Sequence, residues 1–66
     1  MTRLERRMRD ALEGNEREVL QHYNAEIASE RNHKAQSHNA FIRQCCDQQI
    51  ERLLAEKQQI EAATID

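Results

Sequence analysis

The sequence predicts an all-α fold: an antiparallel helical hairpin of two long helices that dimerises into a four-helix bundle or a coiled coil. Three observations predict this class. The 66 residues contain no proline and a single glycine, whereas strands and tight turns depend on both residue types. Apolar side chains recur at helical spacing in two stripes. A chain this short rarely builds a stable core alone, which favours a second copy.

The first helix is predicted over about residues 2–30. Its stripe falls at intervals of three, four or seven residues and passes Gly14 without losing phase, which favours a continuous helix. In such a helix the glycine costs about 1 kcal/mol relative to alanine. The alternative is a break at Gly14, with Asn15 as the N-cap and Glu18 completing a capping box. The stripe, with Ala11 beside it, comprises Leu4, Met8, Leu12, Val19, Tyr23 and Ile27.

A polar turn is predicted over about residues 31–37 and a second helix over about 38–64, in one helical domain of residues 1–66. Residues 29–39 include no large apolar side chain and are rich in turn and cap formers. On one straight helix the second stripe would lie roughly 150° from the first, so the chain must reverse for the two to meet. The second stripe comprises Ile42, Cys46, Ile50, Leu53 and Ile60, beside the stem of Lys57.

Charged and apolar side chains outside the stripes support this arrangement. Four arginines crowd the start of the first helix and two acidic residues end the second, where the helix dipole disfavours each, and in a hairpin they would be neighbours. These residues are Arg3, Arg6, Arg7, Arg9, Glu61 and Asp66. Four apolar side chains off the stripes predict a second contact surface that a homodimer would bury. They are Leu20, Phe41, Leu54 and Ile65.

Composition limits the classes of function. The net charge of −2 gives no general attraction to nucleic acid or anionic membrane. No apolar run approaches the roughly 20 residues that span a bilayer, and the first residues do not resemble a signal peptide. A cytoplasmic location is therefore expected. Low hydropathy leaves disorder as a competing interpretation, which the periodicity of the apolar residues disfavours.

The spacing of the potential metal ligands predicts no metal site and no cofactor. There is no CxxC or HxxxH pair, and adjacent cysteines point about 100° apart on a helix. The potential ligands are His22, His33, His38, Cys45 and Cys46. No glycine-rich anion-binding turn accompanies them, and the chain has little room for a concave pocket. The sequence predicts that the protein is not an enzyme.

The opening of the chain resembles that of MbeD/MobD-type plasmid mobilisation proteins, which are short coiled coils, and of similar small phage proteins. The resemblance covers about the first third and departs from the family at Gly14. It implies an accessory protein that acts through protein contacts. The segments that carry it are Met1-Thr2-Arg3-Leu4-Glu5, Asp10-Ala11-Leu12-Glu13 and Gln21-His22-Tyr23.

The predicted function is a protein-binding adaptor or inhibitor from a phage or plasmid, acting as a helical homodimer on a host or mobile-element protein. The residues expected to contact the partner are Arg3, Arg6, Arg7, Leu20 and Phe41. The alternative is a small regulator that binds RNA or DNA through the arginine-rich start of the first helix. Interleaved acidic residues and the lack of a nearby aromatic side chain for base stacking weigh against it.

Overall fold

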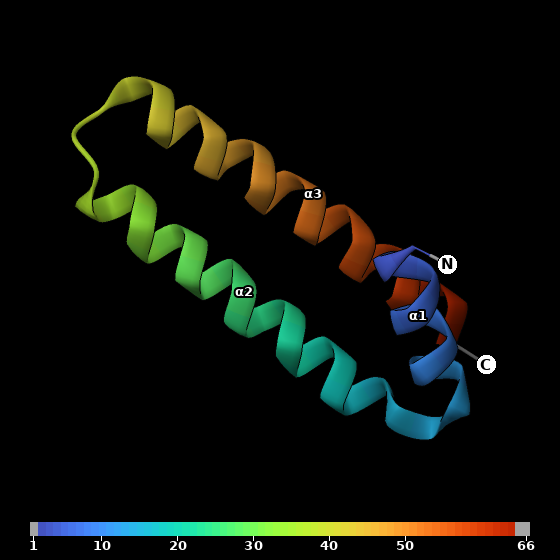
Figure 1. The fold of residues 1–66 in the computed structure, drawn as a ribbon. Helices are drawn as coiled ribbons and strands as arrows, with labels where there is room; N and C mark the ends of the chain where they lie inside the picture. Colours follow the sequence, from blue (N-terminus) through green and yellow to red (C-terminus); the bar gives the residue numbers. More distant parts are fainter. Residues whose placement is uncertain (1, 65–66) are drawn as a thin grey trace.

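The computed structural model describes residues 2–64, which form helical segments joined by one short loop. In order, these segments are α1 (Arg3–Asp10), η1 (Ala11–Asn15), α2 (Glu16–Gln36) and α3 (Ala40–Thr64). Figure 1 shows α2 and α3 side by side as an antiparallel hairpin, with α1 folded back over the end of α3. The predicted all-helical class, with two long helices packed against each other, is confirmed.

The chain turns sharply at Gly14, so the first helix is not continuous over residues 2–30. Gly14 has φ +105°, a backbone conformation that residues with a Cβ atom rarely adopt. The break therefore follows the alternative interpretation, although the Asn15 side chain makes no capping hydrogen bond to α2. Continuity was wrongly predicted because the phase of an apolar stripe does not report a change in the direction of the helix axis.

The loop between α2 and α3 is shorter than predicted and spans residues 37–39 rather than 31–37. Helix α2 continues to Gln36 because residues 31–36 contain neither proline nor glycine. Their side chains are mostly polar and mostly exposed, which is compatible with a helix that is open to solvent at this end. Asn39 ends the loop. Its Oδ1 accepts hydrogen bonds from the backbone N–H groups of Phe41 (2.8 Å) and Ile42 (3.4 Å), which sets the start of α3.

The core lies between α2 and α3 and extends under α1. Its buried side chains are Ala11, Val19, Tyr23, Ile27, Cys46, Leu53 and Ile60. Leu4, Met8, Leu20 and Ile50 are half-buried and pack against them. Leu20 was expected on a second contact surface but instead supports the core. Ile65, expected on that surface too, lies outside the described residues.

Two residues of the predicted apolar stripes are exposed. Leu12 is 62% exposed because the turn at Gly14 reorients the preceding residues, so that Ala11 faces the core instead. Ile42 is 37% exposed because it lies in the first turn of α3, opposite the loop, where α2 has ended. Neither side chain is therefore buried within the single chain, unlike most of the other apolar residues of the stripes.

Among residues 2–64, no helix has the length and apolar character needed to cross a membrane.

Candidate functional site

Helix α1 is held in place by ion pairs to α2. Arg3 Nη2 donates to Glu26 Oε2 at 2.8 Å, and Arg7 Nη2 donates to Glu26 Oε1 at 2.5 Å. The Glu26 carboxylate therefore accepts hydrogen bonds from both arginines, which lie four residues apart on one face of α1. The expected pairing of these arginines with the end of the second helix is not observed. Glu61 pairs with Lys57 at 3.8 Å, and Asp66 lies outside the described residues.

Tyr23 connects α1 to both long helices. The guanidinium carbon of Arg7 lies 4.4 Å from the centre of the Tyr23 ring, a distance typical of a cation–π contact. The Tyr23 hydroxyl donates to Glu56 Oε1 on α3 at 3.0 Å. Burial raises the pKa of Tyr23 above its ordinary value. The buried ring thus keeps its only polar atom paired, and α1, α2 and α3 meet at this residue.

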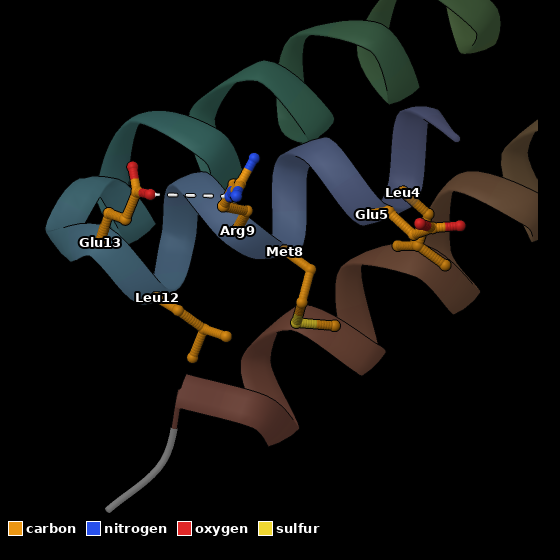
Figure 2. A pocket seen from close by; sticks show the side chains of 6 residues that line it. All are labelled: Leu4, Glu5, Met8, Arg9, Leu12 and Glu13. Atoms are coloured by element: carbon orange, nitrogen blue, oxygen red, sulfur yellow. Dashed lines mark ion pairs between the residues drawn. The ribbon is translucent and has the colours of Figure 1, made fainter. Parts of the chain in front are cut away.

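This anchoring leaves an apolar groove along the face of α1 that is directed toward α3, with a volume of about 460 Å³. Figure 2 shows Leu4, Met8 and Leu12 pointing from α1 and η1 toward the C-terminal end of α3. Their spacing of four residues places them in one row along the helix. Leu4 and Met8 are half-buried, whereas Leu12 is mainly exposed at the open end of the row.

Charged side chains border the groove. Glu5, Arg9 and Glu13 line it beside the apolar row, and Arg9 Nε lies 3.9 Å from Glu13 Oε1 (Figure 2). Both members of that pair are well exposed, so it contributes little to stability. An apolar strip with a charged border is the chemistry of a surface that binds one face of an amphipathic helix.

The residues expected to contact a partner are dispersed in the structure. Arg3 and Arg7 are engaged by Glu26, whereas Arg6 is exposed and forms no ion pair within residues 2–64. Leu20 packs against the core. Phe41 is 72% exposed at the loop end of the hairpin, far from α1 (Figure 1). These five residues therefore do not form one surface.

The groove was missed because Leu4, Met8 and Leu12 were all assigned to the core. The sequence does contain a signal for the groove. If the helix breaks at Gly14, the part of the first stripe before the break can point in a new direction. Leu12, the last stripe residue before Gly14, then no longer needs a partner in α3. Only the direction of α1 relative to α2, which the turn at Gly14 sets, decides which of these side chains remain accessible.

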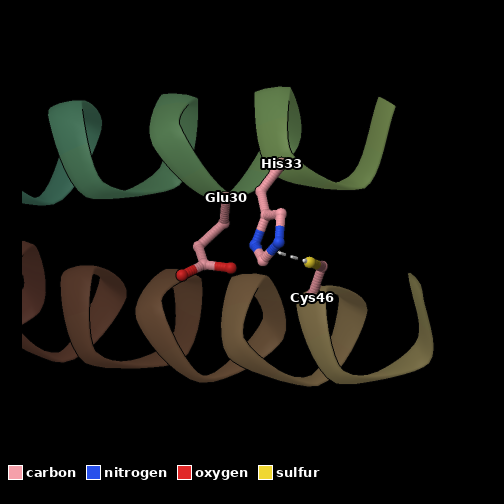
Figure 3. A group of neighbouring side chains, drawn as sticks. All are labelled: Glu30, His33 and Cys46. Atoms are coloured by element: carbon pink, nitrogen blue, oxygen red, sulfur yellow. Dashed lines mark hydrogen bonds between the residues drawn. The ribbon is translucent and has the colours of Figure 1, made fainter. Parts of the chain in front are cut away.

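A second cluster lies near the loop, between α2 and α3. Figure 3 shows Glu30 and His33 of α2 pointing toward Cys46 of α3. The Cys46 Sγ atom lies 3.7 Å from His33 Nδ1. Burial and the neighbouring Glu30 carboxylate raise the pKa of the Cys46 thiol, so it is a poor nucleophile at neutral pH. The sequence signal for this cluster is Glu30-x-x-His33, a spacing that places both side chains on one helix face.

No protein-family model, curated protein or solved structure matches this chain. Its function is therefore inferred from the geometry described above.

The pairing of Glu26 with the arginines predicts how the stability of the fold depends on pH. The hydrogen bond from Arg7 is the main reason that the pKa of Glu26 lies below its ordinary value of 4.5. Because the folded pKa is the lower one, the pair stabilises the fold above pH 4.5, and this contribution is lost as the pH falls through the folded pKa. We expect Glu26→Gln to cost about 0–1 kcal/mol at neutral pH, since the pair is partly exposed to solvent.

Urea denaturation at neutral pH and at acidic pH tests this expectation. The difference in stability between wild type and Glu26→Gln should shrink as the pH is lowered. Glu13→Gln is the matched control, because its pair with Arg9 is exposed and does not anchor α1. A constant difference at both pH values would contradict the assignment.

Proposed function

We propose that this chain is a non-enzymatic protein-binding module, an adaptor or inhibitor, whose groove accepts one amphipathic helix of a partner protein. The observation that supports the proposal is the row of Leu4, Met8 and Leu12, which is apolar, accessible and bordered by charge. Leu4 and Leu12 are eight residues apart, so the row is about 12 Å long, which suits about two turns of a partner helix. A phage or plasmid source is part of the proposal and follows only from the opening residues.

We also propose that the protein acts as a homodimer. Phe41 and Ile42 form an exposed apolar pair at the loop end of the hairpin, and a 66-residue chain with a small core gains stability from association. This pair and the groove lie at opposite ends of the hairpin (Figure 1). A second copy packed on Phe41 and Ile42 would therefore leave the groove free for the partner.

The test is an affinity capture from bacterial lysate, with and without nuclease and at about 50 and 200 mM salt. It uses three forms of the chain: wild type, Leu12→Asp and Phe41→Asp. We expect wild type to retain a stoichiometric protein. A charge at position 12 should weaken that binding at least about tenfold, because the aspartate would lose its hydration in an apolar interface. Both substituted side chains are exposed, so both variants should keep the wild-type circular dichroism spectrum.

Phe41→Asp is the matched control for the groove. It should retain the captured protein but sediment as a monomer, whereas wild type and Leu12→Asp should sediment as dimers. Capture that survives Leu12→Asp would reject the groove as the binding surface. A monomeric wild type would reject the homodimer.

The same experiment addresses nucleic-acid binding. Two of the four arginines at the start of the chain are paired with Glu26, which weighs against this alternative. Phosphate contacts weaken by orders of magnitude between about 50 and 200 mM salt, whereas an apolar interface responds little. Capture that depends on intact nucleic acid and falls steeply with salt would identify the arginine-rich start as the binding surface.

A further inference from the structure

Glu30, His33 and Cys46 bring three different metal-binding groups together across the hairpin. A carboxylate oxygen, an imidazole nitrogen and the sulfur atom all lie within 4.8 Å of one another. Glu30 and His33 lie on one face of α2, and Cys46 faces them from α3 (Figure 3). Two elements of the fold therefore supply the groups, which a search for sequence motifs cannot detect.

One of the three separations is that of two ligands on a single zinc ion. Ligands at about 2.0–2.3 Å from a tetrahedral zinc ion lie roughly 3.3–3.8 Å from one another. The 3.7 Å between Cys46 Sγ and His33 Nδ1 falls in this range. Thiolate, imidazole and carboxylate are also the three ligand types that zinc favours in proteins. We propose that Glu30, His33 and Cys46 bind one Zn²⁺ ion, with water as the fourth ligand.

The charges around the cluster favour a cation. Glu30 forms no ion pair with a basic residue within residues 2–64. Lys34 follows Glu30 by four residues and would be its natural partner on α2, but it pairs with Asp47 of α3 at 2.5 Å. The carboxylate instead faces the thiol and the imidazole. On binding, Zn²⁺ displaces the thiol proton to solvent and bonds to the thiolate, and no group is oxidised or reduced.

The cluster is accessible to an ion from solvent. It lines a depression of about 300 Å³, together with Ile42, Cys45 and Gln49. His33 lies in the last turn of α2 and Cys46 in the second turn of α3, so the ion would join the two helices next to the loop. It would also fix the start of α3, which carries the exposed pair Phe41 and Ile42.

The experiment is a titration of the reduced, metal-free full chain with Zn²⁺ and with Co²⁺. We expect one ion per chain, a thiolate-to-cobalt charge-transfer band in the near ultraviolet, and a higher melting temperature with Zn²⁺. His33→Gln and Glu30→Gln should each weaken Zn²⁺ binding by at least about tenfold, since a ligand contributes at least as much as the groups that orient it. Cys46→Ser should abolish the charge-transfer band.

Two matched controls use histidines that lie outside the cluster and do not line its depression. His38→Gln and His22→Gln each alter an exposed side chain, so both should bind Zn²⁺ as wild type does. His33 is itself exposed, so His33→Gln keeps the test valid even if substitution of the buried Cys46 prevents folding. The absence of a charge-transfer band in wild type, or equal losses of Zn²⁺ affinity in His38→Gln and His33→Gln, would overturn the proposal and leave only a thiol–imidazole hydrogen bond.

Discussion

Leu53→Ala should lower the free energy of unfolding by about 2–4 kcal/mol, because it removes buried methyl groups and leaves a cavity between α2 and α3. Leu53 is 4% exposed and belongs to the main core cluster. The total stability of a domain this small is only a few kcal/mol, so the variant should be largely unfolded near room temperature. Thermal and urea denaturation followed by circular dichroism measure the effect.

Leu12→Ala is the matched control, because it makes the same chemical change at a leucine that the sequence analysis also assigned to an apolar stripe. Since that side chain is mostly exposed, its truncation should change stability by no more than about 0.5 kcal/mol. Equal losses for the two variants would mean that Leu12 is buried and that α1 does not turn at Gly14. Wild-type stability in both would mean that the core between α2 and α3 is wrongly assigned.

Gly14→Ala should destabilise the protein by about 1–2 kcal/mol, the cost of placing a Cβ atom in the left-handed region of the backbone. A Cβ atom built at this position meets no other atom within 4 Å, so the effect isolates backbone conformation from steric overlap. Gly14→Asn should lose less, because asparagine tolerates the left-handed region better than alanine. Denaturation of the three proteins under identical conditions gives the comparison.

The sign of the alanine effect distinguishes the two interpretations of the first helix. In a continuous helix, alanine would stabilise the chain by about 1 kcal/mol relative to glycine. A stabilised Gly14→Ala variant would therefore contradict the turn, and with it the groove formed by Leu4, Met8 and Leu12. A destabilised variant that also fails to capture the partner protein would connect the turn to the groove.

The sequence was sufficient for the helical class and for most of the core. Val19, Tyr23, Ile27, Leu53 and Ile60 recur at the helical period, and all are buried. Periodicity identifies such residues because burial on a helix repeats every three to four residues wherever the helix lies. It failed at Leu12 and Ile42, where burial depends on whether another helix lies opposite and not on the position within the stripe.

The two candidate sites depended more strongly on tertiary structure. The groove depends on the direction of α1 relative to α2, which the turn at Gly14 and the pairing of Arg3 and Arg7 with Glu26 establish. The sequence predicted no metal site, because it contains no CxxC or HxxxH pair. His33 and Cys46 come from different helices, so their proximity is a consequence of hairpin register.

The sequence alone therefore determined that the chain is helical, that it reverses near the polar segment, and which apolar stripe faces inward. These properties are local or periodic, because they follow from residue propensity and from the 3.6-residue repeat of the helix. Only the tertiary structure decided the fold-back of α1, the exposure of Leu12 and the meeting of Glu30, His33 and Cys46. These properties depend on the positive φ of one glycine and on the relative shift of two packed helices, neither of which leaves a repeat in the sequence.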